Sequence, residues 1–310
     1  MSLLVSYVVA TDTFATIRGV VRAVRASTIA GGVELVIVCP SAAALGLEHD
    51  VTDGIGAVRI VEVPEIVPLS PARAEGVRAT SCPLVFIGET HSFPHPDCLE
   101  ALVVALKSGE FVAATPVIEN ANPQTAFSWA GLMLTYRHWL APVTRGETDV
   151  VSTYNACFRR DHLVAFGDQL TAMMDYGSGL DRHLRANGGR LLMEPAARLM
   201  HLNMAAFPGW MVERFLSGRF WGTARSREWS PARRLAYVLG APLIPVLIAG
   251  RALQSPQWTH HRRQMPRGTL VALLLCALAT AAGEVTAYVA GNGQTPVRLA
   301  EYELHRARYV

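Results

Sequence analysis

The segment VFIGETHSFPHPD, Val85 to Asp97, joins an apolar run to a group of polar side chains. Residues 85–87 have the β-branched and aromatic character of a strand that is buried on both faces. The run stops at a glycine, and Glu89 and His91 follow with one residue between them. A carboxylate and an imidazole placed together at the end of a buried strand predict either a solvated polar loop or a metal-binding edge. The rest of the chain has to decide between them.

The first 120 residues alternate between apolar runs and helical patterns. Strand, helix and strand in succession predict an α/β fold with a mostly parallel, doubly wound sheet. In such sheets ligands bind beyond the carboxyl ends of the strands, where Glu89 and His91 are expected to lie. The predicted strands are 3–10, 33–39, 57–63, 82–88 and 110–118, and the predicted helices are 14–27, 70–80, with Ser70 as N-cap, and 95–109.

The middle of the chain mixes the two patterns. A strand running into a short helix is predicted for 149–163, and two short strands are predicted within 189–203. Helices are expected at 124–140, 178–189 and 210–227.

The composition is apolar, at 51% hydrophobic and 17% charged residues, whereas charged residues are nearer a quarter in soluble proteins. Two uncharged runs in the last 80 residues, 235–250 and 269–283, account for much of this excess. A bilayer span needs about 20 apolar residues. Both runs are therefore short for a span, unless the second continues through Glu284.

The charge is divided unevenly along the chain. From Trp229 onward there are nine Arg and three Glu, a net of +6, and the remaining 19 basic and 22 acidic residues before Trp229 give −3. Basic residues beside apolar runs favour a membrane surface. The tryptophans do not alternate with arginines as base-stacking surfaces do, so no nucleic acid is expected as a partner.

The five cysteines are scattered and include no CxxC pair. This pattern argues against a disulfide framework or a structural zinc, and it fits a reducing compartment. The opening MSLLVSYVVATD lacks the basic start and cleavage site of a signal peptide, so it is interpreted as a first strand.

Several segments, in their order and spacing, resemble family 2 glycosyltransferases of the GT-A fold, including bacterial members. They are VSYVVAT with the following helix, VELVIV, ARAEGVRATSCPLVFIGETH, STYNACFRRDHL and GLDRHLRANGGRLLMEPAARLMHLN. The tail resembles the membrane-associated ends of some bacterial members. The resemblance implies a GT-A domain at 1–228, with a nucleotide-sugar half (1–120) and an acceptor half (121–228). A helical, membrane-associated tail is then expected at 229–310.

In that family a DxD-type motif ends the fourth strand and holds a divalent metal. Glu89, Thr90 and His91 stand at this place, and the resemblance implies His201 as a third ligand. A carboxylate with imidazoles suits Mn²⁺ better than Mg²⁺, which prefers oxygen ligands. The alternatives are a solvated loop for the first pair and a structural role for His201.

The resemblance also implies contacts to the nucleotide sugar. The family usually has an aspartate after the second strand to read the base, and Cys39 stands there. Base recognition would then use Thr11 and Asp12, or backbone groups, although Asp12 is equally suited to cap a helix. Arg73 is expected to face the diphosphate, because arginine matches phosphate geometry, or else to lie on a helix surface. The expected acceptor-side residues are Asn155, Arg159 and Arg160.

The general base is expected in an acidic pair before the 178–189 helix. The alignment puts Tyr176 and Gly177 there, which carry no carboxylate. Asp175, one residue earlier, and Asp181, on the helix, are the candidates; either could instead be an acid at a helix N-terminus.

The resemblance therefore implies an inverting, metal-dependent glycosyltransferase, of the hexosyltransferase class, using a UDP- or GDP-linked sugar. Its acceptor would be a lipid carrier, a polysaccharide precursor or a secondary metabolite. One alternative is a catalytically weak, membrane-anchored partner of another transferase. A nucleotidyltransferase is a second, but VATDTFATIRG does not supply the glycine-rich basic loop that it needs.

The arginines at 251, 262, 263 and 267 lie between the two apolar runs. A spanning hairpin would put them outside, against the positive-inside tendency, if the catalytic part is cytoplasmic, where nucleotide sugars are made. The tail is therefore predicted to be monotopic or re-entrant on the cytoplasmic face. The alternatives are a spanning hairpin, packing on the catalytic domain and an oligomer contact.

Overall fold

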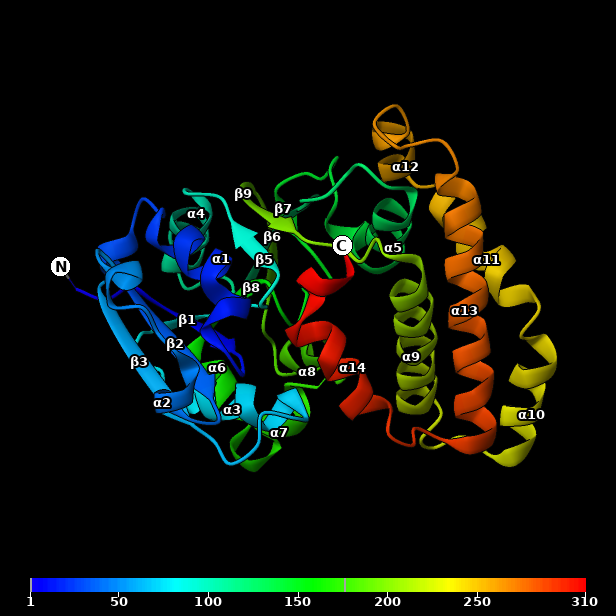
Figure 1. Cartoon of the computed structure of the whole chain (residues 1–310), viewed down its shortest axis with the longest axis horizontal. Coiled ribbons are helices and arrows are strands. Elements are labelled where there is room, and N and C mark those ends of the chain that lie inside the picture. The colour runs from blue at the N-terminus through cyan, green and yellow to red at the C-terminus, as the bar shows by residue number, and fades with distance from the viewer. Residues whose placement is uncertain (1, 176) are drawn as a thin grey trace. The chain divides into compact units, whose positions relative to one another are not determined.

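The computed structural model describes residues 2–175 and 177–310. It divides into two compact units, each drawn in Figure 1. The sheet unit contains Met1–Glu119 and Val143–His201, and the helical unit contains Asn120–Pro142 and Leu202–Val310. These bounds differ from the expected division at residue 229, because the helix before that point packs on the C-terminal helices.

The strands of the described residues form one nine-stranded sheet, in the order β3-β2-β1-β4-β8-β6-β9-β5, with β7 paired to β9. The expected α/β class, with a helical C-terminal region, is confirmed. The strands are β1 Val5–Ala10, β2 Val33–Cys39, β3 Ala57–Glu62, β4 Leu84–Ile87, β5 Ser92–Pro94, β6 Ala113–Asn120, β7 Gly146–Glu147, β8 Ala156–Arg159 and β9 Leu191–His201.

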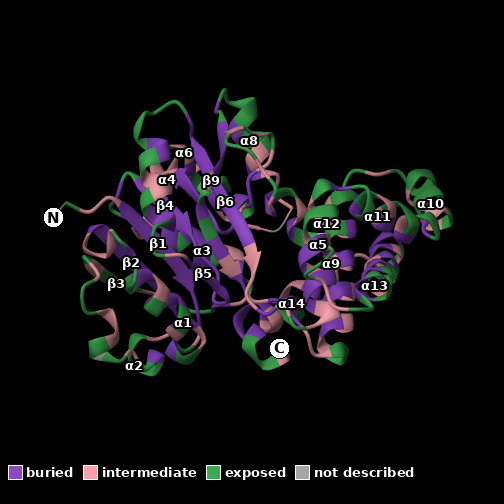
Figure 2. Ribbon diagram, turned by 90° about the horizontal axis from the view of Figure 1, so that it is seen from above, coloured by how far each residue is buried: buried purple, intermediate pink, exposed green. Residues whose placement is uncertain are grey.

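β3, β2, β1 and β4 pair in parallel, each with the next in this order. Every residue of β1, β2 and β4 is buried, as their continuous apolar sequences require, and Figure 2 shows this part of the sheet in purple. The antiparallel pairs are β4 with β8, β8 with β6, and β9 with β5 and β7. The carboxyl ends of β1, β2 and β4 consequently meet at one edge.

β9 is one strand of 11 residues, where two short strands were expected. β7 pairs with it at Leu192 and Met193, and β5 pairs with it from Leu199 to His201. Pro195, which has no N–H to donate, lies between these two ladders. The strands paired on either side of Pro195 allow β9 to continue through it.

Helices cover the sheet. α3 packs on β1 and β2, and α4 packs on β9. Close packing of α3 depends on Gly76, since an added Cβ would lie 2.5 Å from Cγ1 of Val8. The expected cap at Ser70 is displaced, because α3 begins at Leu69 with Pro68 as N-cap. The helices of this unit are α1 Phe14–Arg25, α2 Ala42–Leu45, α3 Leu69–Ala79, α4 Cys98–Lys107, α6 Arg160–Val164, α7 Leu170–Met173 and α8 Leu180–Ala186.

The helical unit is built around α13, a single helix of 22 residues that continues through Glu284. It packs most extensively against α9, where glycines allow the backbones to touch. A Cβ at Gly218 would lie 2.1 Å from the carbonyl oxygen of Thr280. The helices are α5 Ala126–Tyr136, α9 Phe207–Arg225, α10 Pro231–Gly240, α11 Leu243–Leu253, α12 Pro256–His261, α13 Thr269–Ala290 and α14 Thr295–Leu304.

Among the described residues, α13 is long and apolar enough to cross a membrane, judged by length and composition alone. α10 and α11 pass the same test only as a pair, and they are bent by 65° at the break between them. Half of the most apolar stretch of α13 is buried inside the protein.

Candidate metal centre

Three side chains converge in the sheet unit. Oε2 of Glu89 lies 3.6 Å from Nε2 of His91 and 3.6 Å from Nε2 of His201. One ligand atom from each residue lies within 4.8 Å of the others. All three residues are at most 2% exposed. A buried carboxylate is thus shared by two imidazoles that face it from different segments.

Two strand pairings bring these residues together. Gly88 follows β4 and its N–H donates to the carbonyl of Val8 at 2.8 Å, which fixes the start of the loop that carries Glu89. His91 directly precedes β5, whose first residue, Ser92, pairs with His201 at the end of β9. The antiparallel ladder between β5 and β9 therefore places His201 beside Glu89 and His91, although it is distant in the sequence.

The spacing suits one cation better than direct hydrogen bonds. A separation of 3.6 Å is too long for a hydrogen bond. Two ligand atoms about 2.1 Å from one cation, at angles of about 90–120°, are about 3.0–3.6 Å apart. The residues present therefore fit a divalent cation held by one carboxylate and two imidazoles.

Neighbouring groups orient these side chains. Nδ2 of Asn155 donates to Oε2 of Glu89 at 2.5 Å, and the hydroxyl of Ser92 donates to the same oxygen at 3.1 Å. Nδ1 of His91 lies 3.3 Å from the hydroxyl of Thr90. Such outer contacts fix the rotamers and ring orientation of metal ligands.

The ring of Tyr7, in β1, lies against Gly88. A Cβ added to Gly88 would be 2.4 Å from the Tyr7 hydroxyl oxygen. Burial raises the pKa of Tyr7 well above its ordinary value, and the nearby Cys98 and Glu89 raise it further. The phenol is therefore neutral, and its hydroxyl has no hydrogen-bond partner among the described residues.

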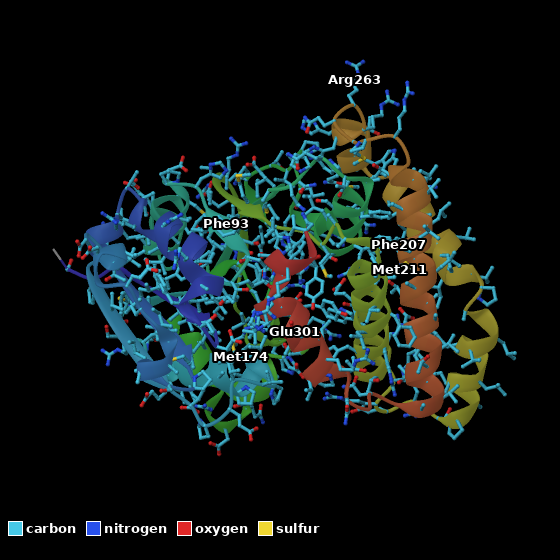
Figure 3. The ribbon with its side chains drawn as sticks, viewed as in Figure 1. Phe93, Met174, Phe207, Met211, Arg263 and Glu301 are labelled. Carbon is cyan, nitrogen blue, oxygen red and sulfur yellow. The ribbon has the colours of Figure 1, made fainter. Side chains whose placement is uncertain are left out.

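Arg73, on α3, is buried and stacked on an aromatic ring. Its guanidinium carbon lies 3.7 Å from the ring centroid of Tyr154. The hydroxyl of Tyr154 donates to the carbonyl of Met174, which is labelled in Figure 3, at 2.6 Å. Tyr154 directly precedes Asn155, and Met174 directly precedes Asp175. The stacking contact and the hydrogen bond therefore join α3 to two segments that carry expected site residues.

The expected nucleotide contacts lie at the carboxyl edge of the sheet. Thr11 follows β1, and its N–H donates to the carbonyl of Val38 at 2.8 Å. Asp12 is half-buried beside it. Cys39 is the last residue of β2; burial raises the pKa of its thiol, so it remains a neutral core side chain.

Arg159 and Arg160 are not brought to this edge. β8 runs antiparallel to β4, so Ala156 lies opposite Ile87, whereas Arg159 lies opposite Leu84 at the other end of β4. The guanidinium of Arg160 donates to Thr80 and to the carbonyl of Arg78. These arginines therefore lie at the amino end of β4.

The two base candidates stand in different settings. Asp175 follows α7 and is half-buried. Asp181 lies in the first turn of α8 and accepts a hydrogen bond from the N–H of Arg182 at 2.8 Å, as an N-terminal helix acid does. Tyr176 lies outside the described residues.

Sequence reasoning missed three residues that contact the expected site residues or the loop carrying them, namely Ser92, Tyr7 and Tyr154. Ser92 follows the Glu89–Thr90–His91 triplet directly, and a strand at 92–94 would have indicated it. Tyr7 and Tyr154 lie in apolar segments and carry no sequence signal that distinguishes them from core aromatics.

No family model matches the chain, and no curated protein matches it. Among solved structures it is similar to that of GalNAc-T7 with UDP, GalNAc and Mn²⁺, with a TM-score of 0.51 and 13% identity over 75% of this chain. The chain spans about half of that protein, 52% of its length. It also matches a mannosyltransferase of Pyrobaculum calidifontis in complex with GDP-Man and Mn²⁺, with a TM-score of 0.49 and 15% identity, over 97% of this chain and 79% of that one.

The fold is therefore the GT-A type found in glycosyltransferases. Within it, the cluster of Glu89, His91 and His201 stands beyond the carboxyl ends of the parallel strands.

Proposed function

We propose that the protein is a metal-dependent glycosyltransferase that moves a hexose from a UDP- or GDP-linked donor. The observation that carries this proposal is the buried carboxylate shared by two imidazoles at the ligand-binding edge of a GT-A fold. The GalNAc-T7 structure was obtained with UDP and Mn²⁺, which supports a nucleotide sugar as the ligand at this edge.

Glu89, His91 and His201 would hold the cation. When bound, it would neutralise negative charge on the departing diphosphate. Two nitrogen ligands and one oxygen ligand favour Mn²⁺ over Mg²⁺. Arg73 would contact the diphosphate, and Thr11, Asp12 and Cys39 would contribute to the base and ribose side of the same edge.

Transfer with inversion needs a base that takes the proton of the acceptor hydroxyl as that oxygen attacks the sugar. We assign this role to Asp175. The carbonyl of the preceding residue, Met174, accepts a hydrogen bond from the hydroxyl of Tyr154. This bond links the segment that carries Asp175 to the start of β8. Asp181 is the second candidate, but it already accepts a backbone hydrogen bond in α8.

The helical unit is proposed to rest on the cytoplasmic face of an anionic membrane, as a monotopic or re-entrant element. Its α10–α11 pair exposes a row of apolar side chains to solvent. Leu239 is 73% exposed, Val246 66% and Leu243 62%. Contiguous exposed apolar surface of this kind marks an interaction site.

Charge distinguishes lipid from a second copy of the chain as the occupant. Between Trp229 and Gly283 there are six arginines and no Asp or Glu. Arg263, in the turn after α12, extends away from α12 in Figure 3. Two such faces would repel each other, whereas anionic headgroups attract them. A lipid-linked acceptor would reach an enzyme placed in this way.

A turnover assay tests the function. Purified protein is incubated with UDP-glucose, UDP-N-acetylglucosamine, UDP-galactose and GDP-mannose, with and without Mn²⁺, in the presence of a bacterial lipid extract. We expect Mn²⁺-dependent release of UDP or GDP from one donor and none from the Glu89→Ala variant. Donor binding without turnover would favour the alternative of a catalytically weak partner.

A further inference from the structure

Asn155 contacts the metal cluster from a third segment. Its Nδ2 lies 2.5 Å from Oε2 of Glu89, the same oxygen that lies 3.6 Å from both His91 and His201. Asn155 is 0% exposed and Glu89 is 2% exposed. The amide therefore holds the atom on which the cluster converges, in a place where no solvent competes.

The backbone sets this contact. Asn155 has a φ of 60°, and it is the only non-glycine residue with a positive φ in the described part of the chain. Its N–H donates to the carbonyl of Ile87 at 2.6 Å, and β8 begins at the next residue, opposite Ile87. The left-handed conformation favours glycine, asparagine and aspartate. The turn therefore puts a short polar side chain just past the end of β4, beside Glu89.

The chemistry of the amide matches a supporting role. A neutral amide adds no charge of its own, and its N–H₂ group donates to an anionic carboxylate in a strong, charge-assisted bond. The other end of the amide, Oδ1, accepts no hydrogen bond from the described residues. The orientation of the side chain is thus set by its bond to Glu89.

We propose that Asn155 is a positioning residue of the metal centre, which holds the Glu89 carboxylate toward His91 and His201. The inference rests on the proposed metal role of these three residues. It gives Asn155 a function in metal affinity, in addition to its expected place on the acceptor side. Ser92 supports the same oxygen at the longer distance of 3.1 Å.

The test measures Mn²⁺ affinity, by the electron paramagnetic resonance signal of free Mn²⁺ during titration of the full-length protein. Asn155→Gly keeps the backbone conformation and removes the donor; Asn155→Ser leaves a side chain too short to reach. We expect both variants to weaken Mn²⁺ binding by about 10- to 100-fold, the usual effect of removing an outer-shell partner. Asn187→Gly, which removes an exposed asparagine whose Nδ2 donates to the carbonyl of His183, is the control and should bind like the unaltered protein.

The outcomes separate the two proposals. Equal affinity in the unaltered protein and in whichever Asn155 variants fold would overturn the positioning role and leave the metal site standing. Failure of the unaltered protein to bind Mn²⁺ would overturn the metal site, and the role of Asn155 with it. When the donor concentration is varied in the turnover assay, we expect the Asn155 variants to raise the KM for the donor by a larger factor than they lower kcat. The reason is that the lost contact acts through the cation.

Discussion

Oε2 of Glu89 lies 3.6 Å from Nε2 of His201, although Glu89 belongs to the first of the sheet unit's two segments and His201 is the last residue of the second. A cation bound between them would link the loop after β4 to the end of β9. A ligand that binds only the native state stabilises it.

We therefore expect Mn²⁺ to raise the melting temperature of the protein, and His201→Ala to abolish that rise. His95→Ala is the matched control, because His95 is a histidine of the same unit that pairs with Glu119 instead. An equal rise in all three proteins would place the Mn²⁺ elsewhere.

The contact between Tyr7 and Gly88 gives a second prediction. Gly88→Ala would put a Cβ 2.4 Å from the Tyr7 hydroxyl oxygen and 2.5 Å from ring carbons, so the loop carrying Glu89 must shift. We expect a loss of about 1–3 kcal/mol in unfolding free energy, as for other overpacked cores, together with weaker Mn²⁺ binding. Denaturant unfolding measures the first effect and Mn²⁺ titration the second. Normal stability and normal affinity would show that the loop has more room than the structure indicates.

Tyr7→Phe is expected to have little effect or to stabilise the protein slightly. The hydroxyl is buried without a hydrogen-bond partner among the described residues, and such a group costs about 1–3 kcal/mol. Turnover should be unchanged. A large drop in turnover with unchanged stability would instead give the phenol a catalytic role.

A buried ion pair should govern the acid stability of the helical unit. Glu213 forms a bidentate pair with Arg214, and both are buried. Burial alone would raise the pKa of Glu213, but Arg214, together with Arg306 and Ser217, more than offsets this, and the pKa is lowered from 4.5. A depressed pKa adds stability that is present above about pH 4.5 and is lost as the pH falls further.

Glu213→Gln should therefore destabilise the protein by about 3–5 kcal/mol at neutral pH, by leaving Arg214 buried without its charge partner. The difference from the unaltered protein should shrink below pH 4.5. Glu301→Gln, which breaks the exposed pair with Arg308, is the control and should cost about 0–1 kcal/mol. A pH-independent difference would refute the electrostatic account.

Membrane binding can be checked by flotation with vesicles. We expect the protein to float with phosphatidylglycerol vesicles, to float poorly with phosphatidylcholine, and to dissociate as salt rises. Leu239→Asp combined with Val246→Asp should reduce binding by about tenfold or more, since each buried apolar side chain contributes about 1.5–3 kcal/mol. Val104→Asp, an equally exposed position on α4, should not. A soluble dimer that does not float would identify a second copy as the occupant.

The sequence predicted those features that depend on local pattern. The apolar runs predicted β1, β2 and β4. The expected parallel pairing of these strands predicted a ligand-binding edge at their carboxyl ends, and Glu89 and His91 lie there. His201 required the family resemblance, because the ladder between β5 and β9 is a non-local pairing that no spacing along the chain reveals.

The same limit explains the remaining differences. The run FRR suggested that Arg159 and Arg160 accompany Asn155, but three residues of an antiparallel strand carry Arg159 to the far end of β4. The positive φ of Asn155 arises in the turn before β8, where its N–H donates to the carbonyl of Ile87, and an asparagine in an apolar segment does not indicate it. The units differ from the expected division because contacts between α9 and α13, and not local composition, decide where α9 packs.

The most direct test of the central claim is anomalous diffraction at the manganese absorption edge, from crystals grown with Mn²⁺ and UDP. We predict one strong peak within ligand distance of Oε2 of Glu89, Nε2 of His91 and Nε2 of His201, lost in crystals of the His201→Ala variant. A peak elsewhere in the protein, or none at a Mn²⁺ concentration that supports turnover, would contradict the proposed metal centre.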